Sequence, residues 1–293
     1  TTENGLGDND VNDVYAVGSM VYAATKGGLS ISVDGGATFT NRTTENGLGD
    51  NDVNDVYAVG SMVYAATKGG LSISVDGGAT FTNRTTENGL GSSRVFHVYA
   101  VGSTVYAGHE CWAYCRTETS GLSISVDGGA TFTNQTTENG LGRSSVFDVY
   151  AVGSMVYAAA RGGLSISVDG GLNFSSKSWE ETEVGPGIQI DSVYAVGSTV
   201  YVATSNSFGW SKLRNNWFWF DGGLMISVDG GATFTNRTTE NGLGDNDVND
   251  VYAVGSTVYA ATGCYRLSLK PGGLSISVDG GATFTNRTTE NGL

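Results

Sequence analysis

Residues 1–42, TTENGLGDNDVNDVYAVGSMVYAATKGGLSISVDGGATFTNR, are repeated letter for letter at 43–84, and the rest of the chain consists of edited copies of this unit. The unit holds four runs of strand-forming residues, at 11–17, 20–25, 29–33 and 37–43, with Gly-rich turn sequences between them. This pattern predicts a four-stranded antiparallel meander. Both faces of so small a sheet carry apolar residues, so one unit must stack on its neighbours.

The sequence Val-Tyr-Ala-Val of the first strand marks each copy of the unit. It recurs six times, starting at Val14, Val56, Val98, Val149, Val193 and Val251. A four-stranded unit of roughly 40 to 50 residues has the size of a propeller blade. We therefore predict an all-β fold, a six-bladed β-propeller of four-stranded antiparallel blades that forms one domain over 1–293. The expected blades cover 7–46, 47–88, 89–138, 139–182, 183–240 and 241–293.

The charge balance is acidic, with 15 Lys and Arg against 29 Asp and Glu and a net charge of −14. This argues against a nucleic-acid partner and favours a soluble protein, predicted to be a monomer. The sequence has no apolar run near 18 residues and no leader, so we expect no membrane span and a cytosolic or mature chain. Of these two, we favour a mature protein that is extracellular or on the cell surface.

A short motif links the third and fourth strands. Ser32-Val-Asp34-Gly-Gly36-Ala-Thr-Phe39 has the spacing S-x-D-x-G-x-x-F and occurs in all six copies. It resembles the Asp-box of sialidase-like (BNR) propellers, and the neighbouring ENGL…VYAAT segment resembles the propeller repeat of two-component regulator sensors. The resemblance implies a structural box on the side away from any active site. We expect Asp34 to accept backbone N–H groups, Gly36 to supply an unusual φ and Phe39 to pack beneath the turn.

The edits to the repeat are confined to one side of the predicted blades. Turns between the first and second strands and between the third and fourth form one rim, the turn rim, and are constant as Gly-Ser and Asp-Gly-Gly. The opposite rim, the loop rim, holds the turns between the second and third strands and the crossovers between blades. The plain Lys26-Gly27 turn is lengthened to 109–120, 205–221 and 263–271 in blades 3, 5 and 6. The crossovers 91–97 and 142–148 are altered, and 175–192 is new.

The edited segments contain all five Trp, both His and all three Cys of the chain. Trp, Tyr and Arg dominate the energy of protein interfaces, so we predict a ligand-binding surface on the loop rim. Its candidate residues are Arg94, Phe96, His97, His109, Trp112, Tyr114, Arg116, Arg143, Phe147, Trp179, Phe208, Trp210, Arg214, Trp217, Phe218, Trp219, Phe220, Tyr265 and Arg266. The structural alternative is an extended hairpin, 207–213 with 217–221, whose aromatic residues pack on the blades or on each other.

Other small constellations have competing interpretations. Cys111 and Cys115 are candidates for a disulfide in an oxidising compartment, or for a free thiol pair. His97 and His109 with these cysteines match no zinc motif, and the Asp8, Asp10, Asp13 triplet and its copies lack EF-hand spacing. We predict no metal and no cofactor. Asn41-Arg-Thr43 and its copies match the glycosylation pattern.

The sialidase resemblance also implies an arginine cluster, a Tyr/Glu pair and an acidic residue at a catalytic centre. No Tyr/Glu pair can be traced because the first strands are nearly identical, so we predict that the protein is not an enzyme. The expected function is a non-catalytic binding module for a macromolecule, with a protein epitope favoured. A carbohydrate-binding lectin, a sialidase-like glycosidase and a sensor domain are the alternatives. Identical blades indicate recent amplification or an engineered scaffold.

Overall fold

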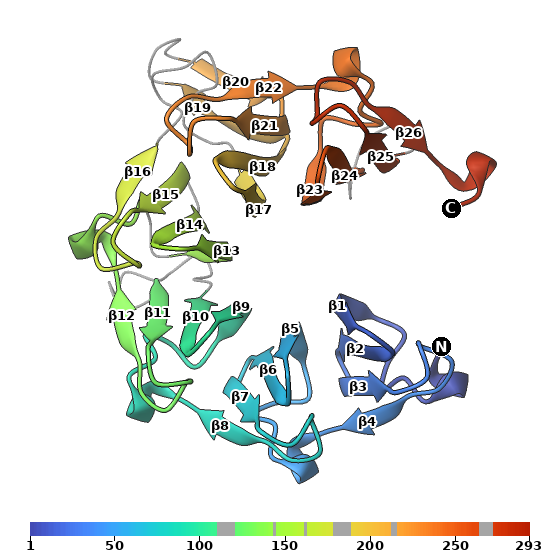
Figure 1. The fold of residues 1–293 in the computed structure, drawn as a ribbon, viewed down its shortest axis with the longest axis vertical. Coiled ribbons are helices and arrows are strands. Elements are labelled where there is room, and N and C mark those ends of the chain that lie inside the picture. The colour runs from blue at the N-terminus through green and yellow to red at the C-terminus, as the bar shows by residue number, and fades with distance from the viewer. Residues whose placement is uncertain (110–120, 143–144, 161–162, 178–188, 212–215, 264–271) are drawn as a thin grey trace. The chain divides into compact units, whose positions relative to one another are not determined.

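The computed structural model describes residues 1–109, 121–142, 145–160, 163–177, 189–211, 216–263 and 272–293, of which 207–211 and 216–220 are described as backbone. These residues form an all-β, six-bladed propeller of four-stranded antiparallel sheets, which confirms the predicted fold class (Figure 1). The contacts of the chain group into two compact units, 1–138 with 144–149 and 139–143 with 150–293. The prediction of one domain stays a prediction.

The strands of each blade follow one another in the sheet in chain order. Unit 1 contains blades 1 to 3, formed by β1 (Val11–Val17), β2 (Met20–Thr25), β3 (Gly28–Ser32), β4 (Thr40–Arg42), β5 (Val53–Val59), β6 (Met62–Thr67), β7 (Gly70–Ser74), β8 (Thr82–Arg84), β9 (Val95–Val101), β10 (Thr104–His109), β11 (Leu122–Ser125) and β12 (Thr133–Gln135). Blades 4 to 6 are formed by β13 (Val146–Val152), β14 (Met155–Ala160), β15 (Gly163–Ser167), β16 (Ser175–Lys177), β17 (Gln189–Val196), β18 (Thr199–Ser205), β21 (Gly223–Ser227), β22 (Thr235–Arg237), β23 (Val248–Val254), β24 (Thr257–Thr262), β25 (Gly273–Ser277) and β26 (Thr285–Arg287).

The fourth strand is shorter than the predicted run 37–43 because the motif before it is a turn. The Asp34 carboxylate accepts hydrogen bonds from Thr38 N (2.9 Å), Thr38 Oγ1 (2.6 Å) and Ser32 Oγ (2.7 Å). Gly36 N donates to Ser32 Oγ (2.8 Å), and Gly36 has a φ of 94°. These bonds hold the pKa of Asp34 well below its usual range, which agrees with the predicted structural role of this carboxylate.

Each TTENG segment forms a short 3₁₀ turn that the sequence pattern did not predict; the first five precede a first strand and the last follows β26. These turns lie at Thr2–Asn4, Thr44–Asn46, Thr86–Asn88, Thr137–Asn139, Thr239–Asn241 and Thr289–Asn291. In the second of them, Thr43 caps the turn and Gly47 ends it with a φ of 95°. Asn46 O then accepts from Phe81 N (2.8 Å), so the turn docks beside the fourth strand of the blade that follows it.

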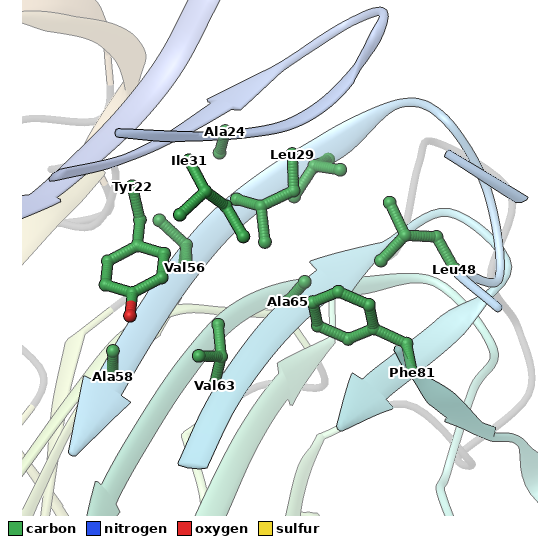
Figure 2. Close-up of a cluster of buried hydrophobic side chains, with 11 residues drawn as sticks. Tyr22, Ala24, Leu29, Ile31, Leu48, Val56, Ala58, Val63, Ala65 and Phe81 are labelled. Carbon is green, nitrogen blue, oxygen red and sulfur yellow. The ribbon is translucent and has the colours of Figure 1, made fainter. Parts of the chain in front are cut away.

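Neighbouring blades stack through apolar side chains, as the two-faced repeat predicts. Figure 2 shows the cluster between blades 1 and 2, in which Tyr22 and Ile31 lie against Val56, Val63 and Phe81 of the next blade. Val56 is 2 % exposed, and its copy Val98 is 1 % exposed at the next interface. Burying a Val side chain contributes about 1.5 kcal/mol or more, so stacking supplies the stability that one blade lacks.

The two rims are confirmed within each blade. On the turn rim, Gly35 N donates to Ser19 O (3.0 Å), which joins the two constant turns. On the loop rim, Lys26 N donates to Asp10 O (3.3 Å) and Lys26 Nζ lies 2.6 Å from Asp10 Oδ2, which joins the second turn to the crossover. The edited segments that are described therefore lie on the same rim of their blades. No helix in the described part of the chain is long and apolar enough to cross a membrane.

Candidate functional site

A buried hydroxyl node holds the loop rim onto each standard blade. In blade 2, Ser72 Oγ accepts from Gly49 N of the crossover (2.9 Å) and donates to Asn83 Oδ1 of the fourth strand (3.1 Å). Asn83 Nδ2 in turn donates to Gly69 O of the second turn (2.8 Å). One serine thus joins the crossover to the fourth strand, and the asparagine carries the connection to the turn. The loop rim is therefore anchored to a rigid sheet.

We expect Ser72→Ala to destabilise the protein by about 2 kcal/mol, because it leaves the Gly49 N–H and Asn83 Oδ1 without their partner. The measurement is the free energy of unfolding from urea denaturation. Ser61→Ala, on an exposed turn of the same blade, is the matched control and should change it by less than about 0.5 kcal/mol. Equal effects of the two substitutions would show that the node contributes nothing.

Blade 5 departs from this node where its loops are longest. Met225 replaces the serine, and the Asn236 Oδ1 atom is buried without a hydrogen-bond partner, although Asn236 Nδ2 still donates to Gly222 O (3.2 Å). Met225 is 5 % exposed and packs in the cluster that contains Val193 and Val200. At this position blade 5 therefore has apolar packing in place of the polar hydrogen-bond network.

The long insertion of blade 5 forms a two-stranded antiparallel ribbon, β19 (Ser207–Ser211) and β20 (Asn216–Phe220), so the backbone hairpin of the structural alternative is present (Figure 1). The packing of its aromatic residues on the blades, which that alternative also requires, stays a prediction. The register pairs Phe208 with Trp219 and Trp210 with Trp217. Since residues two apart in a strand share a face, these four positions belong to one face of the ribbon. The other face carries the pairs Gly209 with Phe218 and Ser207 with Phe220. Four of the six aromatic positions, including all three Trp, therefore belong to one face.

The base of the ribbon is fixed to the crossover that enters blade 6. Asp247 Oδ1 accepts a hydrogen bond from Asn206 N, and Asp247 O accepts from Gly263 N (2.9 Å) where the blade 6 insertion begins. Asp247 is 4 % exposed, whereas the side chain of its blade 1 equivalent Asp10 is 65 % exposed. One buried acidic residue thus contacts the first residues of both insertions.

A second carboxylate lies at the foot of the ribbon. Asp191, in β17, accepts hydrogen bonds from Ser205 Oγ and from Gln189 Nε2 (2.6 Å). Burial, reinforced by the charge of Asp247, raises the pKa of Asp191 to about 6. The Asp191 carboxyl is therefore mostly ionised at neutral pH and becomes protonated under mildly acidic conditions. The sequence pattern identified Asp247 only as part of a copy of the Asp8, Asp10, Asp13 triplet, which favoured a solvated turn, and it gave no signal for Asp191.

Three candidates assigned to crossover loops lie within first strands instead. Phe96 and His97 belong to β9, and Phe147 belongs to β13. Phe96 and Phe147 are half-buried at the position where Asn54 donates to Val95 O of the next blade (2.8 Å). His97 lies between Asp55 and Asp148, within 3 Å of each carboxylate. The edits therefore change residues that form hydrogen bonds between blades, in addition to residues of the loops.

His109 is buried and has structural partners. Its Nε2 lies 2.7 Å from Ser123 Oγ and its Nδ1 lies 3.1 Å from Arg94 O. Burial lowers the pKa of His109 to about 4, so the ring is neutral at physiological pH. His109 contacts the crossover backbone at Arg94 and does not belong to the proposed binding surface. Arg94 itself is exposed on the loop rim.

The remaining predicted residues are placed less fully or not at all. Candidates outside the described residues are Trp112, Tyr114, Arg116, Arg143, Trp179, Arg214, Tyr265 and Arg266, with the cysteines Cys111, Cys115 and Cys264. Of the ribbon positions Phe208, Trp210, Trp217, Phe218, Trp219 and Phe220, the backbone is described. The proposed disulfide and the zinc alternative therefore stay predictions.

The calcium and glycosylation patterns have structural explanations in the described blades. Asp8 Oδ1 accepts from Asp10 N (2.8 Å), Asp10 pairs with Lys26, and Asp13 Oδ2 accepts from Val56 N (3.1 Å). The three carboxylates do not converge, and no group of three metal-binding side chains occurs among the described residues. Asn41 Nδ2, the atom that a glycan would modify, donates to Gly27 O (2.8 Å).

The fold and the position of the edited segments define the class of this protein. It is a β-propeller in which the loop-rim segments differ from blade to blade. A scan against protein-family models finds no match, and neither does a search of curated proteins. Solved propellers are similar: an ancestral GH74 enzyme has a TM-score of 0.67 and 18% identity, covering 96% of this chain and 38% of that one. The extracellular domain of a putative one-component system from B. thetaiotaomicron has a TM-score of 0.65 and 13% identity, covering 92% and 33%.

A further similar structure is YCF48 bound to a D1 peptide, with a TM-score of 0.62 and 12% identity over 98% of this chain and 85% of that one. At these identities the likeness establishes the fold alone. This chain spans about a third to two-fifths of the length of the GH74 enzyme and of the one-component system. The similar propellers thus include enzymes, an extracellular domain and a peptide-binding protein.

Proposed function

We propose that this protein is a non-catalytic binding module that recognises a protein ligand through its loop rim, with the β19–β20 ribbon of blade 5 as the main contact. The observation that carries the proposal is the ribbon register, which places Phe208, Trp210, Trp217 and Trp219 on one face. The hydrogen bonds of Asp247 support it because they fix the ribbon base beside the blade 6 insertion. An anchored aromatic surface loses little conformational entropy on binding.

The ribbon backbone favours a protein over a glycan. β19 and β20 form a sheet of two strands, so among the described residues each strand has one edge without a neighbouring strand. An extended peptide can add to such an edge through main-chain hydrogen bonds while aromatic residues provide side-chain contacts. The net charge of −14 favours a ligand that carries basic residues. The peptide complex of the similar YCF48 propeller is consistent with this class of ligand.

A binding role without catalysis is supported by the described titratable groups. Both ring nitrogens of His97 face carboxylates, and both ring nitrogens of His109 have partners within the blade. Neither histidine has a ring nitrogen available as a general base. We propose a secreted or cell-surface location, consistent with the extracellular domain among the similar structures.

A direct comparison of probes tests this proposal. The full chain is screened against a phage-displayed random peptide library and a glycan array. We expect enrichment of peptides with basic and extended character and no glycan signal. Glycan binding without peptide enrichment would support the lectin alternative instead.

The enzyme alternative has its own test. We expect no turnover when the full chain is incubated with a fluorogenic sialoside, because the Tyr/Glu pair that the sialidase resemblance implies cannot be traced in the sequence. A commercial sialidase serves as the positive control. Turnover that persists in repurified protein would overturn the non-catalytic assignment.

A further inference from the structure

The third residues of the first four first strands form a row of ionisable side chains in unit 1, which contains blades 1 to 3 and residues 144–149 of blade 4. It is Asp in the repeat, as Asp13 and Asp55 show, but blade 3 has His97, and Asp148 follows in blade 4. Each of the first two carboxylates accepts a main-chain hydrogen bond from the next blade: Asp13 Oδ2 from Val56 N (3.1 Å) and Asp55 Oδ2 from Val98 N (2.7 Å). The row therefore lies across the joints between blades.

The geometry requires a doubly protonated His97. Its Nδ1 lies 2.9 Å from Asp55 Oδ2, and its Nε2 lies 2.8 Å from Asp148 Oδ1 and 3.3 Å from Val149 O. All of these oxygens are acceptors, and a neutral imidazole has only one N–H to donate. The two carboxylate side chains are 14% and 13% exposed, so water does not readily replace a missing donor. Imidazolium is the form that satisfies both sides.

A second proton is held at the other end of the row. Asp55 already accepts hydrogen bonds from Val56 N (2.9 Å), Val98 N and His97, which suits an ionised carboxylate. Asp13 is hydrogen-bonded to Asp55, so Asp13 must be the carboxyl that donates. Burial and the charge of Asp55 raise the pKa of Asp13 to about 8. Burial opposes the charge on His97, but Asp148 and Asp55 raise its pKa well above the ordinary value.

We propose that the Asp13–Asp55–His97–Asp148 row is a proton-dependent clamp between the blades of unit 1. In the protonated state Asp13 is a neutral acid, Asp55 and Asp148 are carboxylates and His97 is an imidazolium cation. Each residue of the row therefore attracts the next one. Loss of these protons leaves three carboxylates and a neutral ring, so Asp13 and Asp55 repel each other across one joint and His97 no longer attracts the carboxylates on either side of it. The groups that face His97 are Asp55 from β5 and Asp148 from β13, with Asp13 of β1 acting through Asp55.

The direction of the pH effect follows from where each proton is bound. The unfolded chain releases the Asp13 proton near the ordinary aspartate pKa of 3.8, while the folded chain keeps it to about pH 8. His97 contributes stability below its unfolded pKa, about 6.5, and loses it as pH rises through its higher folded pKa. The turn-rim carboxylates such as Asp34 act oppositely, losing stability only as pH falls below about 4. Stability is therefore expected to decline from mildly acidic to alkaline pH.

Two readouts on the full chain test the clamp. Each proton bound in excess by the folded state changes the folding constant about tenfold per pH unit, so urea denaturation between pH 6 and 9 should show a decline of at least about tenfold. Asp13→Asn places a permanent N–H donor beside Asp55 and should flatten this decline. A profile parallel to that of the unaltered protein would overturn the role of Asp13.

The second readout is the titration of His97 by NMR. The chain has two histidines, and His109, with its pKa near 4, is an internal reference that does not titrate above about pH 5. We expect the His97 ring to titrate well above pH 6.5 and Asp148→Asn to shift that midpoint down by at least about one unit. A His97 midpoint at or below 6.5 in the unaltered, folded protein would overturn the clamp.

Discussion

Replacing residues 205–221 by a single lysine is expected to abolish recognition while leaving the blade folded. The change recreates at 204–223 the sequence Thr-Lys-Gly-Gly of blade 1. Thr204 already pairs with Gly223 as Thr25 pairs with Gly28, and Thr204 Oγ1 donates to Gly223 O (2.9 Å) as Thr25 Oγ1 donates to Gly28 O (2.7 Å). The short turn therefore fits the existing strands.

The expected loss of affinity is large because the aromatic face is removed as a whole. Two desolvated aromatic anchors of about 2 kcal/mol each correspond to roughly a 1,000-fold increase in Kd, so a loss of 100-fold or more is the prediction. The measurement is binding of peptides selected on the unaltered protein. The free energy of unfolding should change by less than about 1 kcal/mol, since loop length contributes little.

A matched variant distinguishes recognition from general damage. Val126 lies on the turn rim of blade 3 and is 75% exposed, so Val126→Ser should leave both binding and stability unchanged. Unchanged peptide binding after the ribbon is removed would refute the proposed contact surface. Loss of the folded state would instead show that the ribbon belongs to the core of blade 5.

Gly47→Ala is expected to destabilise the protein by about 4 kcal/mol. A Cβ at Gly47 would lie 2.1 Å from Phe81 O, and the φ of 95° is one that side chains rarely adopt. The left-handed conformation costs about 1 to 2 kcal/mol. The remainder comes from displacing the Phe81 backbone, which breaks the Phe81 N to Asn46 O bond and disturbs a buried ring.

Gly60→Ala separates the two causes in the same blade. Gly60 also has a positive φ, 61°, but nothing lies within 4 Å of its added Cβ. It should cost only the conformational part, about 1 to 2 kcal/mol. Both values are measured by urea denaturation of the full chain. Equal losses for the two glycines would show that the docking of the 3₁₀ turn on its blade is unimportant.

Much of the fold was predictable because the same pattern of strands and turns occurs in six copies of the repeat. The first two strands match their predicted runs to the residue in blade 1, since alternation and the Gly-Ser turn leave one register. The hairpin at 207–220 was also readable as an alternative. The 3₁₀ turns were missed because TTEN has no apolar period, and their formation depends on docking beside residues such as Phe81, about 35 positions away.

The candidate site was predictable in location and less so in its parts. The altered loops predict the position of the site because loop sequences can vary without disturbing the strands that they connect. The sequence did not reveal that Asp247 links two insertions or that His109 is buried, because both facts depend on which blade covers which residue.

The amino-acid sequence by itself determined the blade, its strand order and the rim on which variation is allowed, because these are local or nearest-neighbour properties of a repeated unit. The tertiary structure decided the charge states. Asp13, Asp55 and His97 sit 42 residues apart in chain order and meet only when blades stack. Identical Asp residues then differ, Asp13 holding a proton and Asp55 ionised, because burial and the neighbouring charge, which no local pattern encodes, set each pKa.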